Sequence, residues 1–201
     1  MDIYVSCDES QEKELRAVFA SEDNIITYSV ELPSGNDLKK NDAFIILNKT
    51  GLVEWNTYGG KPVLINSVTE TLQQLQLPLN VGRINGWNGF LQRSVWEVAS
   101  RQNDVARSIF SAIGIKPVFV KDEAGLVTPR VISMIINEAY FALNEKISTK
   151  EEIDLAMKSG TNYPFGPFEW AEIIGLNEIH HLLSTLAETD KRYLPSFTVE
   201  T

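Results

Sequence analysis

Residues 151–175 read EEIDLAMKSGTNYPFGPFEWAEIIG, and they contain two helical segments separated by a turn. The first segment ends at Gly160, and a Tyr163-Pro164 turn follows. Gly166-Pro167 then has the pattern of a helix start, because proline at the first helical position lacks only an N–H that has no partner within the helix. Gly175 is placed to end this second helix. The stretch therefore predicts closely spaced short helices.

The flanking residues extend this helical pattern in both directions. Ser148-Thr149-Lys150-Glu151 has the spacing of a capping box, and Asn177 is placed to cap a last helix. Strand signals are absent from Thr128 onward, where Thr128 and Pro129 form another helix start. We expect four short helices, which together make residues 122–201 a small all-α domain.

The first of these helices, residues 129–144, is apolar on nearly every face. A helix with this composition must be covered all round. Two ways of covering it carry similar weight: burial against a second chain, which predicts a homodimer through helix 129–144, or a central position in the core of its own domain. Asn137 and Glu138 on this helix need polar partners if they are buried.

Apolar runs alternate with helical spacing in the first part of the chain, which is typical of an α/β fold with a mainly parallel sheet. The strands are expected at residues 2–7, 24–30, 43–47, 63–66, 79–84 and 115–120. Helical spacing covers residues 10–20 and most of residues 89–111, with a break near Gln102-Asn103, whereas residues 32–42 form a loop. Residues 1–121 are thus expected to form an α/β domain, with a linker from Lys121 to Gly125.

Composition limits the partners and the compartment. Hydrophobic residues make up 43% of the chain and charged residues 22%, which predicts a packed core. A net charge of -9 disfavours binding to nucleic acid or to an anionic membrane. The single cysteine, Cys7, allows no internal disulfide and favours the cytoplasm. The only histidines are the adjacent His180 and His181, so no metal site is expected. No apolar run reaches the roughly 18 residues that span a bilayer.

The helical stretch, together with GLVTPR at residues 125–130 and RYLP at residues 192–195, resembles the C-terminal domain of the 3-hydroxyacyl-CoA dehydrogenases. The resemblance is strong over residues 123–195, moderate over residues 63–122 and weak before them. It implies fatty acid metabolism, and a Rossmann-like domain followed by a helical domain that closes over acyl-CoA and mediates dimerisation. Since the family's first domain is longer, residues 1–121 are expected to be a truncated Rossmann-like domain.

Residues 82–99, GRINGWNGFLQRSVWEVA, resemble the part of that family that carries its catalytic His and Glu. The family pattern A-G-x-H-F-F-N-P precedes a helix that carries the Glu. It places Asn85 on the His, Trp87 on the second Phe, Asn88 on the Asn and Glu97 on the Glu. An asparagine has no nitrogen that accepts a proton, so Asn85 cannot deprotonate a 3-hydroxyl group. Glu97 is expected to remain as a helix residue hydrogen-bonded to Asn85.

The cofactor and substrate positions have changed as well. The turn after the first strand, residues 5–10, has no glycine and carries two carboxylates, where a dinucleotide site needs the G-x-G-x-x-G loop. Pro129 replaces the Asn of the family's linker motif. The family's S-N-T-S segment corresponds to residues 66–69, in which Thr69 can offer a hydroxyl to a substrate carbonyl or cap a helix.

We therefore expect a 3-hydroxyacyl-CoA dehydrogenase-like pseudoenzyme that lacks NAD-dependent hydride transfer and binds no NAD. Glu97 and Asn85 mark the catalytic positions, Asn88 the cofactor side, and Thr69 and Trp87 the cleft for an acyl-CoA-like small molecule or a partner. Two alternatives stay open. One is an active oxidoreductase that binds NAD in an unusual mode and in which Glu97 acts through water. The other is a dimerisation scaffold without a ligand.

Overall fold

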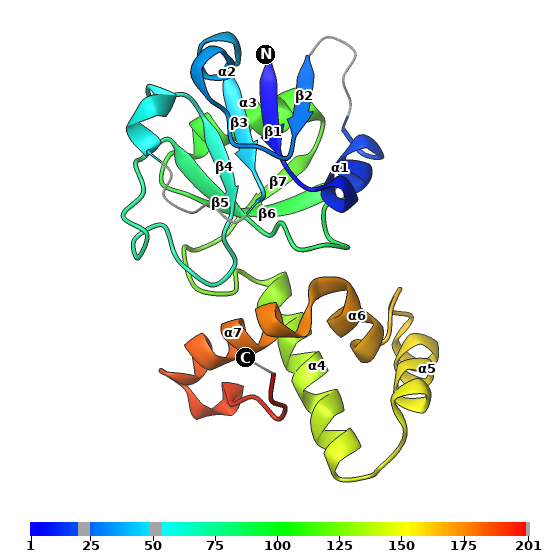
Figure 1. Cartoon of the computed structure of the whole chain (residues 1–201). Helices are drawn as coiled ribbons and strands as arrows, with labels where there is room; N and C mark the ends of the chain where they lie inside the picture. Colours follow the sequence, from blue (N-terminus) through cyan, green and yellow to red (C-terminus); the bar gives the residue numbers. More distant parts are fainter. Residues whose placement is uncertain (20–24, 49–53, 200–201) are drawn as a thin grey trace. The chain divides into compact units, whose positions relative to one another are not determined.

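The computed structural model describes residues 1–19, 25–48 and 54–199. The chain forms two compact units, Met1–Leu126 and Val127–Thr201 (Figure 1). The sequence analysis placed the boundary after residue 121. Two expected element ends, at Ala20 and Asn24, lie outside the described residues.

The first unit is built on a seven-stranded sheet with the order β2-β1-β3-β4-β5-β6-β7. Neighbouring strands run parallel except at the antiparallel pair β5 and β6. The strands are β1 (Ile3–Ser6), β2 (Ile26–Ser29), β3 (Ala43–Ile46), β4 (Val63–Asn66), β5 (Val81–Ile84), β6 (Val95–Ser100) and β7 (Lys116–Phe119). The prediction of an α/β fold with a mainly parallel sheet is confirmed.

Two predictions of local structure in this unit are wrong. Residues 32–42 are not all loop, because α2 (Gly35–Lys40) lies within them. Residues 95–100 form strand β6 rather than part of a long helix, and α3 (Asn103–Ile113) begins after it. Val95, Val98 and Ala99 fit helical spacing, yet pairing with β5 and β7 on both sides outweighs that local pattern. The remaining elements are α1 (Glu9–Arg16) and the 3₁₀ turn η1 (Trp55–Tyr58).

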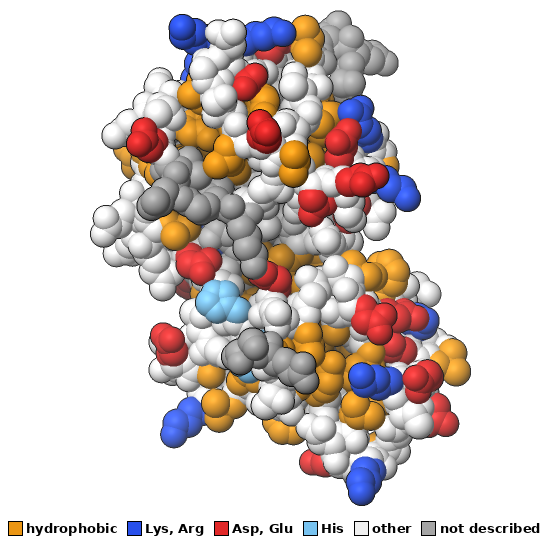
Figure 2. All heavy atoms as spheres, in the orientation of Figure 1, with side chains coloured by type: hydrophobic (Ala, Val, Ile, Leu, Met, Phe, Trp, Pro, Cys, Tyr) orange, Lys and Arg blue, Asp and Glu red, His pale blue; other side chains and the backbone are white. Residues whose placement is uncertain are grey.

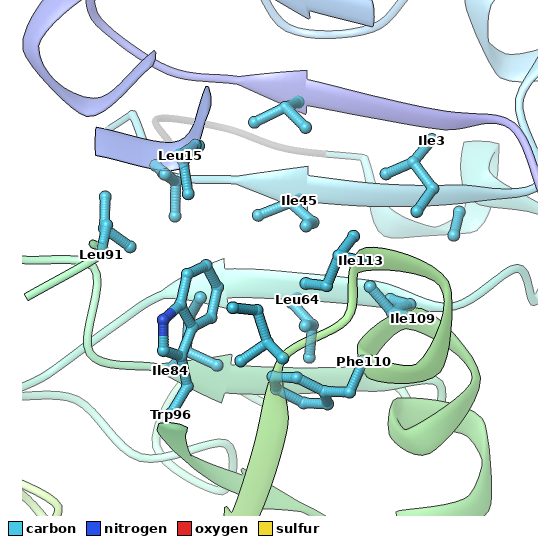
Figure 3. Packing of buried hydrophobic residues seen from close by; sticks show 14 of the residues in the cluster. Ile3, Leu15, Ile45, Leu64, Ile84, Leu91, Trp96, Ile109, Phe110 and Ile113 are labelled. Carbon is cyan, nitrogen blue, oxygen red and sulfur yellow. The ribbon is translucent and has the colours of Figure 1, made fainter. Parts of the chain in front are cut away.

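Apolar side chains pack on both faces of the sheet. One cluster joins the sheet to α1 and α3, and Figure 3 shows Trp96 and Phe110 packed close to Ile84 and Leu64 within it. The rings of Trp96 and Phe110 meet edge to face, with centroids 6.3 Å apart. The second cluster includes Phe44, Tyr58 and Leu72 on the opposite face. Burial on both faces explains the continuously apolar runs of β1, β3 and β4.

The second unit is entirely helical among its described residues, 127–199. Its helices are α4 (Thr128–Asn144), α5 (Lys150–Thr161), α6 (Pro167–Ile174), α7 (Leu176–Ala187) and the 3₁₀ turn η2 (Lys191–Tyr193). The four predicted helices are confirmed.

Their ends differ from the prediction by one or two residues. Val127, not Thr128, precedes α4, and Gly175, not Asn177, precedes α7. The capping box of α5 pairs Thr149 with Glu152, one residue later than expected. Gly160 does not end α5, which continues to Thr161 and stops where Asn162 takes the left-handed conformation.

Helix α4 is covered on one side only within its own unit. It packs against α6 and α7 and buries Ile132, Ile136 and Ala139 there. The opposite side leaves Val131 51% exposed and Phe141 43% exposed. The apolar composition of α4 is therefore accounted for on one face by its own unit, and the described residues of that unit do not cover the other face.

Asn137, on the covered side of α4, is satisfied inside the unit. Its amide donates to the Leu194 carbonyl at 3.0 Å, and its Oδ1 accepts the N–H of Ser196 at 2.8 Å. A bond across subunits is thus not needed to satisfy this side chain.

Candidate functional site

The strand order reverses between β1 and β3, because the chain runs from β1 out to the edge strand β2 and returns on the other side of β1. In open α/β sheets, ligands bind outside the carboxyl ends of the strands at such a point. Here the amide of Asn48 donates to Ser6 Oγ at 3.1 Å and to the Val30 carbonyl at 2.6 Å. Side chains of the protein therefore bridge the ends of β1, β2 and β3 where a ligand would lie.

The turn that follows β1 is capped by its own carboxylate. Asp8 Oδ1 accepts the N–H of Gln11 at 2.8 Å, and Gln11 Oε1 accepts the N–H of Asp8 at 3.1 Å. Glu9 and Glu12 add negative charge to the first turn of α1. A dinucleotide needs free amides and a positive helix terminus at this position. The turn offers carboxylates instead.

Helix α1 also holds the loop after β5 in place. The side-chain amide of Gln11 donates to the Gly86 carbonyl at 3.2 Å. The carboxylate of Glu14 accepts the N–H groups of Gly89 at 2.7 Å and Leu91 at 3.0 Å. The segment that resembles the family's catalytic region is thus fastened by α1, a contact that the sequence analysis did not anticipate because these residues are far apart in the chain.

Asn85 directly follows β5 and is buried, with 8% of its surface exposed. Its Oδ1 accepts the N–H of Trp87 at 3.1 Å, which closes a tight turn. The side-chain oxygen of Asn85 is therefore already hydrogen-bonded to the neighbouring backbone.

Glu97 lies in strand β6, so the expectation that it sits in a helix is wrong. The antiparallel register pairs Ile84 with Val98 and Arg83 with Ala99. Continuing this register by one residue pair places Asn85 opposite Glu97, on one face of the sheet. Strand pairing, rather than a helix, brings the two residues together, and a hydrogen bond between their side chains stays a prediction.

The other predicted site residues lie on the loops at the same edge of the sheet. Trp87 is buried with 5% exposed, and Asn88 is half-buried in the turn that follows. Thr69 is also buried, in the bend after β4. Residues 72–76 form a turn and no helix follows Thr69 there, so the alternative role of Thr69 as a helix cap is wrong. Contacts of Thr69, Trp87 and Asn88 with a ligand stay predictions.

Arg83 was missed by the sequence analysis. It lies in β5 two residues before Asn85, so its side chain is on the same face of the sheet, and it has 0% of its surface exposed. It stands where the family pattern has its glycine. Desolvation lowers the pKa of the Arg83 guanidinium, and the negative charges of Asp122 and Glu97 oppose that change. A charged residue inside the apolar run VGRI was the available signal, because a buried charge requires partners.

Cys7 at the end of β1 is buried, and it is not an activated thiol. Burial raises the pKa of Cys7 to about 12, and the carboxylates of Glu12 and Asp8 add to the shift. Within the described residues, no cluster of three His, Cys, Asp or Glu side chains could hold a metal ion. No helix in the described part of the chain is both long and apolar enough to cross a bilayer.

Residues 125–201 match the model of the 3-hydroxyacyl-CoA dehydrogenase C-terminal domain. The chain is 38% identical over 78 residues to 3-hydroxyadipyl-CoA dehydrogenase of Escherichia coli. The matched segment covers 38% of this chain and 16% of that protein. It is 31% identical over 126 residues to 3-hydroxybutyryl-CoA dehydrogenase of Clostridioides difficile, covering 60% of this chain and 45% of that protein. These matches span less than half the length of either relative.

A solved structure extends the likeness over both units at the level of the fold. The (S)-3-hydroxybutyryl-CoA dehydrogenase from Ralstonia eutropha matches with a TM-score of 0.71 at 18% identity, covering 97% of this chain and 90% of that one. The overall fold of the chain is therefore similar to that of a Rossmann-like dehydrogenase. Residues 125–201 therefore form a C-terminal domain of the 3-hydroxyacyl-CoA dehydrogenase type, and the chain shares the fold of these dehydrogenases.

Proposed function

We propose that this protein is a 3-hydroxyacyl-CoA dehydrogenase-like protein that does not transfer hydride between a 3-hydroxyacyl thioester and NAD. The register of β5 and β6 carries the proposal, because its continuation by one residue pair places Asn85 opposite Glu97. Oxidation of a 3-hydroxyl group requires a base that takes the hydroxyl proton as hydride leaves. A carboxamide does not accept that proton, and the sheet-bearing unit contains no histidine.

The cofactor position supports the same proposal independently. Asp8 caps α1, and further carboxylates surround the turn in which a pyrophosphate would lie. Binding a dinucleotide there would require breaking the Asp8 cap and placing phosphate next to like charges. Both steps oppose binding, so we propose that the protein does not use NAD.

The ligand that we propose is an acyl-CoA-like small molecule, since the relatives act on CoA thioesters by their names. Thr69 and Trp87 would contact its acyl end, because both lie on loops at the carboxyl edge of the sheet. A cytoplasmic location is proposed from the single reduced cysteine.

Binding and turnover test this proposal together. Tryptophan fluorescence is titrated with NADH, CoA and acetoacetyl-CoA separately, and NADH consumption is followed with acetoacetyl-CoA present. Quenching by acetoacetyl-CoA or CoA without any response to NADH is the expected result. Trp87→Phe should reduce the quenching, whereas Trp55→Phe, on the 3₁₀ turn η1 and outside the proposed site, serves as the matched control. Steady NADH consumption that Glu97→Gln abolishes would refute the proposal.

A homodimer through α4 is the second part of the proposal. The uncovered face of this helix, with η2, forms a pocket of about 420 Å³ lined by Arg130, Val131, Met134, Ile135, Glu138, Arg192 and Tyr193. Figure 2 shows apolar side chains reaching the surface of the helical unit. A face of this kind favours a protein partner over solvent.

A second copy of the same chain fits this face by symmetry. Arg130 and Glu138 lie equally far from Met134 along the chain, with opposite charges. If two copies of α4 pack antiparallel about a two-fold axis at Met134, each arginine meets the glutamate of the other copy. The exposed Val127 and Phe141 are related in the same way.

A further inference from the structure

Arg83 is the most deeply buried charge in the described residues of the sheet unit. The family resemblance places a glycine at this position, whereas Arg83 fills the sheet face beside Asn85 and Glu97. With 0% of its surface exposed, the guanidinium has no water to satisfy its five donors. A buried guanidinium is tolerated only if the protein supplies the acceptors and the opposite charge.

Two segments supply these acceptors, and they are far apart in the sequence. From the turn after β4, the carbonyls of Ser67 and Val68 accept Arg83 Nη1 at 3.1 Å and 3.3 Å. From the linker after β7, Asp122 Oδ1 accepts Nε at 2.6 Å, and the Glu123 carbonyl accepts Nη2. One side chain therefore joins the turn to the linker, and both to β5.

Two backbone N–H groups also donate hydrogen bonds to acceptors of Arg83. The Val68 carbonyl also accepts the N–H of Gly125 at 2.8 Å, and Asp122 Oδ1 also accepts the N–H of Leu72 at 3.1 Å. Gly125 has φ +81°, a left-handed conformation that favours glycine. Two acceptors of Arg83, the Val68 carbonyl and Asp122 Oδ1, thus also bond the linker to residues 68–72.

We infer that Arg83 is a latch that makes the turn of residues 67–69 and the linker of residues 122–125 a single rigid assembly. Its charge sets the position of Asp122, and its planar fork sets the direction of the Val68 carbonyl, which accepts the N–H of Gly125. The turn carries Thr69, so Arg83 positions the backbone on which that candidate ligand-contacting side chain stands. The latch does not depend on whether the protein transfers hydride.

An anion-binding role for Arg83 is disfavoured by its partners. Asp122 neutralises it directly, and the carboxylate of Glu97 acts on it electrostatically. The guanidinium donors point to acceptors within the unit rather than to an open cavity.

Amide hydrogen exchange of the whole chain, measured by NMR, tests the latch. Arg83→Lys keeps the charge but loses the planar fork. We expect the amides of Gly125 and Leu72 to exchange at least about tenfold faster in this variant, as local opening of the assembly predicts. The amide of Leu47, which donates to the Ser6 carbonyl elsewhere in the sheet unit, should keep its rate.

Arg101→Lys is the matched control, because Arg101 donates to the carbonyls of Leu72 and Leu77 but not to the linker. It should leave the rate of Gly125 unchanged. If Arg83→Lys does not fold, Asp122→Asn removes only the negative charge that pairs with Arg83, at a partly exposed position, and should give the same pattern. An unchanged rate at Gly125, or equal acceleration at Gly125 and Leu47, would overturn the inference.

Discussion

Single side chains in the sheet unit take roles that the family resemblance does not provide. Asp8 caps a helix terminus, Asn85 closes a turn, and Arg83 joins two segments. In each case, the side chain is bonded to the protein itself. The changes at Asp8 and Asn85 therefore act on different requirements of the reaction, cofactor binding and proton removal.

Because the two requirements are separate, restoring one should not restore turnover. We predict that Asn85→His leaves the reduction of acetoacetyl-CoA by NADH at the background rate, because the proposed exclusion of the cofactor by the Asp8 cap would remain. The measurement is NADH absorbance with freshly purified protein, and the unmodified protein is the control. A gain above about tenfold would show that the cofactor site is intact and that the histidine alone was missing.

The buried thiol of Cys7 gives a second prediction at this scale. Its pKa of about 12, against an ordinary value of 9.0, lowers the reactive thiolate fraction near neutral pH by about a thousandfold. Alkylation by iodoacetamide at pH 8 should be slower by at least about a hundredfold in the folded protein than in urea. Mass spectrometry of the modified fraction measures this rate, and equal rates in the two states would contradict it.

The raised pKa of Cys7 also determines how its contribution to the free energy of unfolding changes with pH. The folded state favours the neutral thiol, so the contribution of Cys7 is fully present below its unfolded pKa near 9 and is lost as pH rises toward 12.

At the scale of elements, the sequence predicted the sheet and the helices better than it predicted the site. Strands β1, β3 and β4 are continuously apolar because both of their faces are buried, and this pattern is visible in the sequence. Strand β6 could not be recognised, since its apolar spacing also fits a helix and only pairing with β5 decides between them. That error placed Glu97 on the wrong type of element.

The candidate site was predicted least accurately, because its contacts join segments that are far apart in the sequence. Glu14 binds the loop after β5, and Arg83 binds the linker after β7, and neither pairing leaves a periodic signal in the sequence. The signals for helix ends in the second unit depend on neighbouring residues only. The helix ends near Thr149, Gly166-Pro167 and Gly175 could therefore be predicted with errors of one or two residues.

One contact between elements of the helical unit gives a stability prediction. Asp154 of α5 is buried, and its carboxylate accepts the N–H of Phe168 at 2.8 Å and of Glu169 at 3.2 Å, at the start of α6. Gly166 leaves room for it, because an added Cβ there would lie 2.3 Å from Asp154 Cγ. The aspartate thus satisfies two amides at a helix N-terminus.

We predict that Asp154→Ala lowers the free energy of unfolding by about 1–3 kcal/mol, because two buried N–H groups lose their acceptor. Urea unfolding followed by circular dichroism measures this change. Glu151→Ala, at an exposed position of the same helix, is the matched control and should change stability by less than about 0.5 kcal/mol. A similar loss in both variants would show that the effect belongs to α5 as a helix rather than to the cap.

At the scale of the whole molecule, the main open question is what covers the apolar face of α4 that the described residues of the helical unit leave exposed. The two units each have their own packed core, yet Val127, Val131 and Phe141 remain exposed along one side of this helix. Because apolar surface favours burial, a second chain lowers the free energy of this face in a way that the monomer does not.

We predict that Val131→Asp converts the protein from dimer to monomer. Each copy would place a charge in the apolar centre of the two-fold contact, while the side chain stays exposed, and therefore tolerated, in the isolated chain. Sedimentation equilibrium at micromolar concentration should show association weakened at least about tenfold, with an unchanged circular dichroism spectrum. Leu155→Asp is the control, since Leu155 is 62% exposed on α5 and lies outside this face. If the unmodified protein sediments as a monomer at high micromolar concentration, or if both variants dissociate equally, α4 does not form the proposed contact.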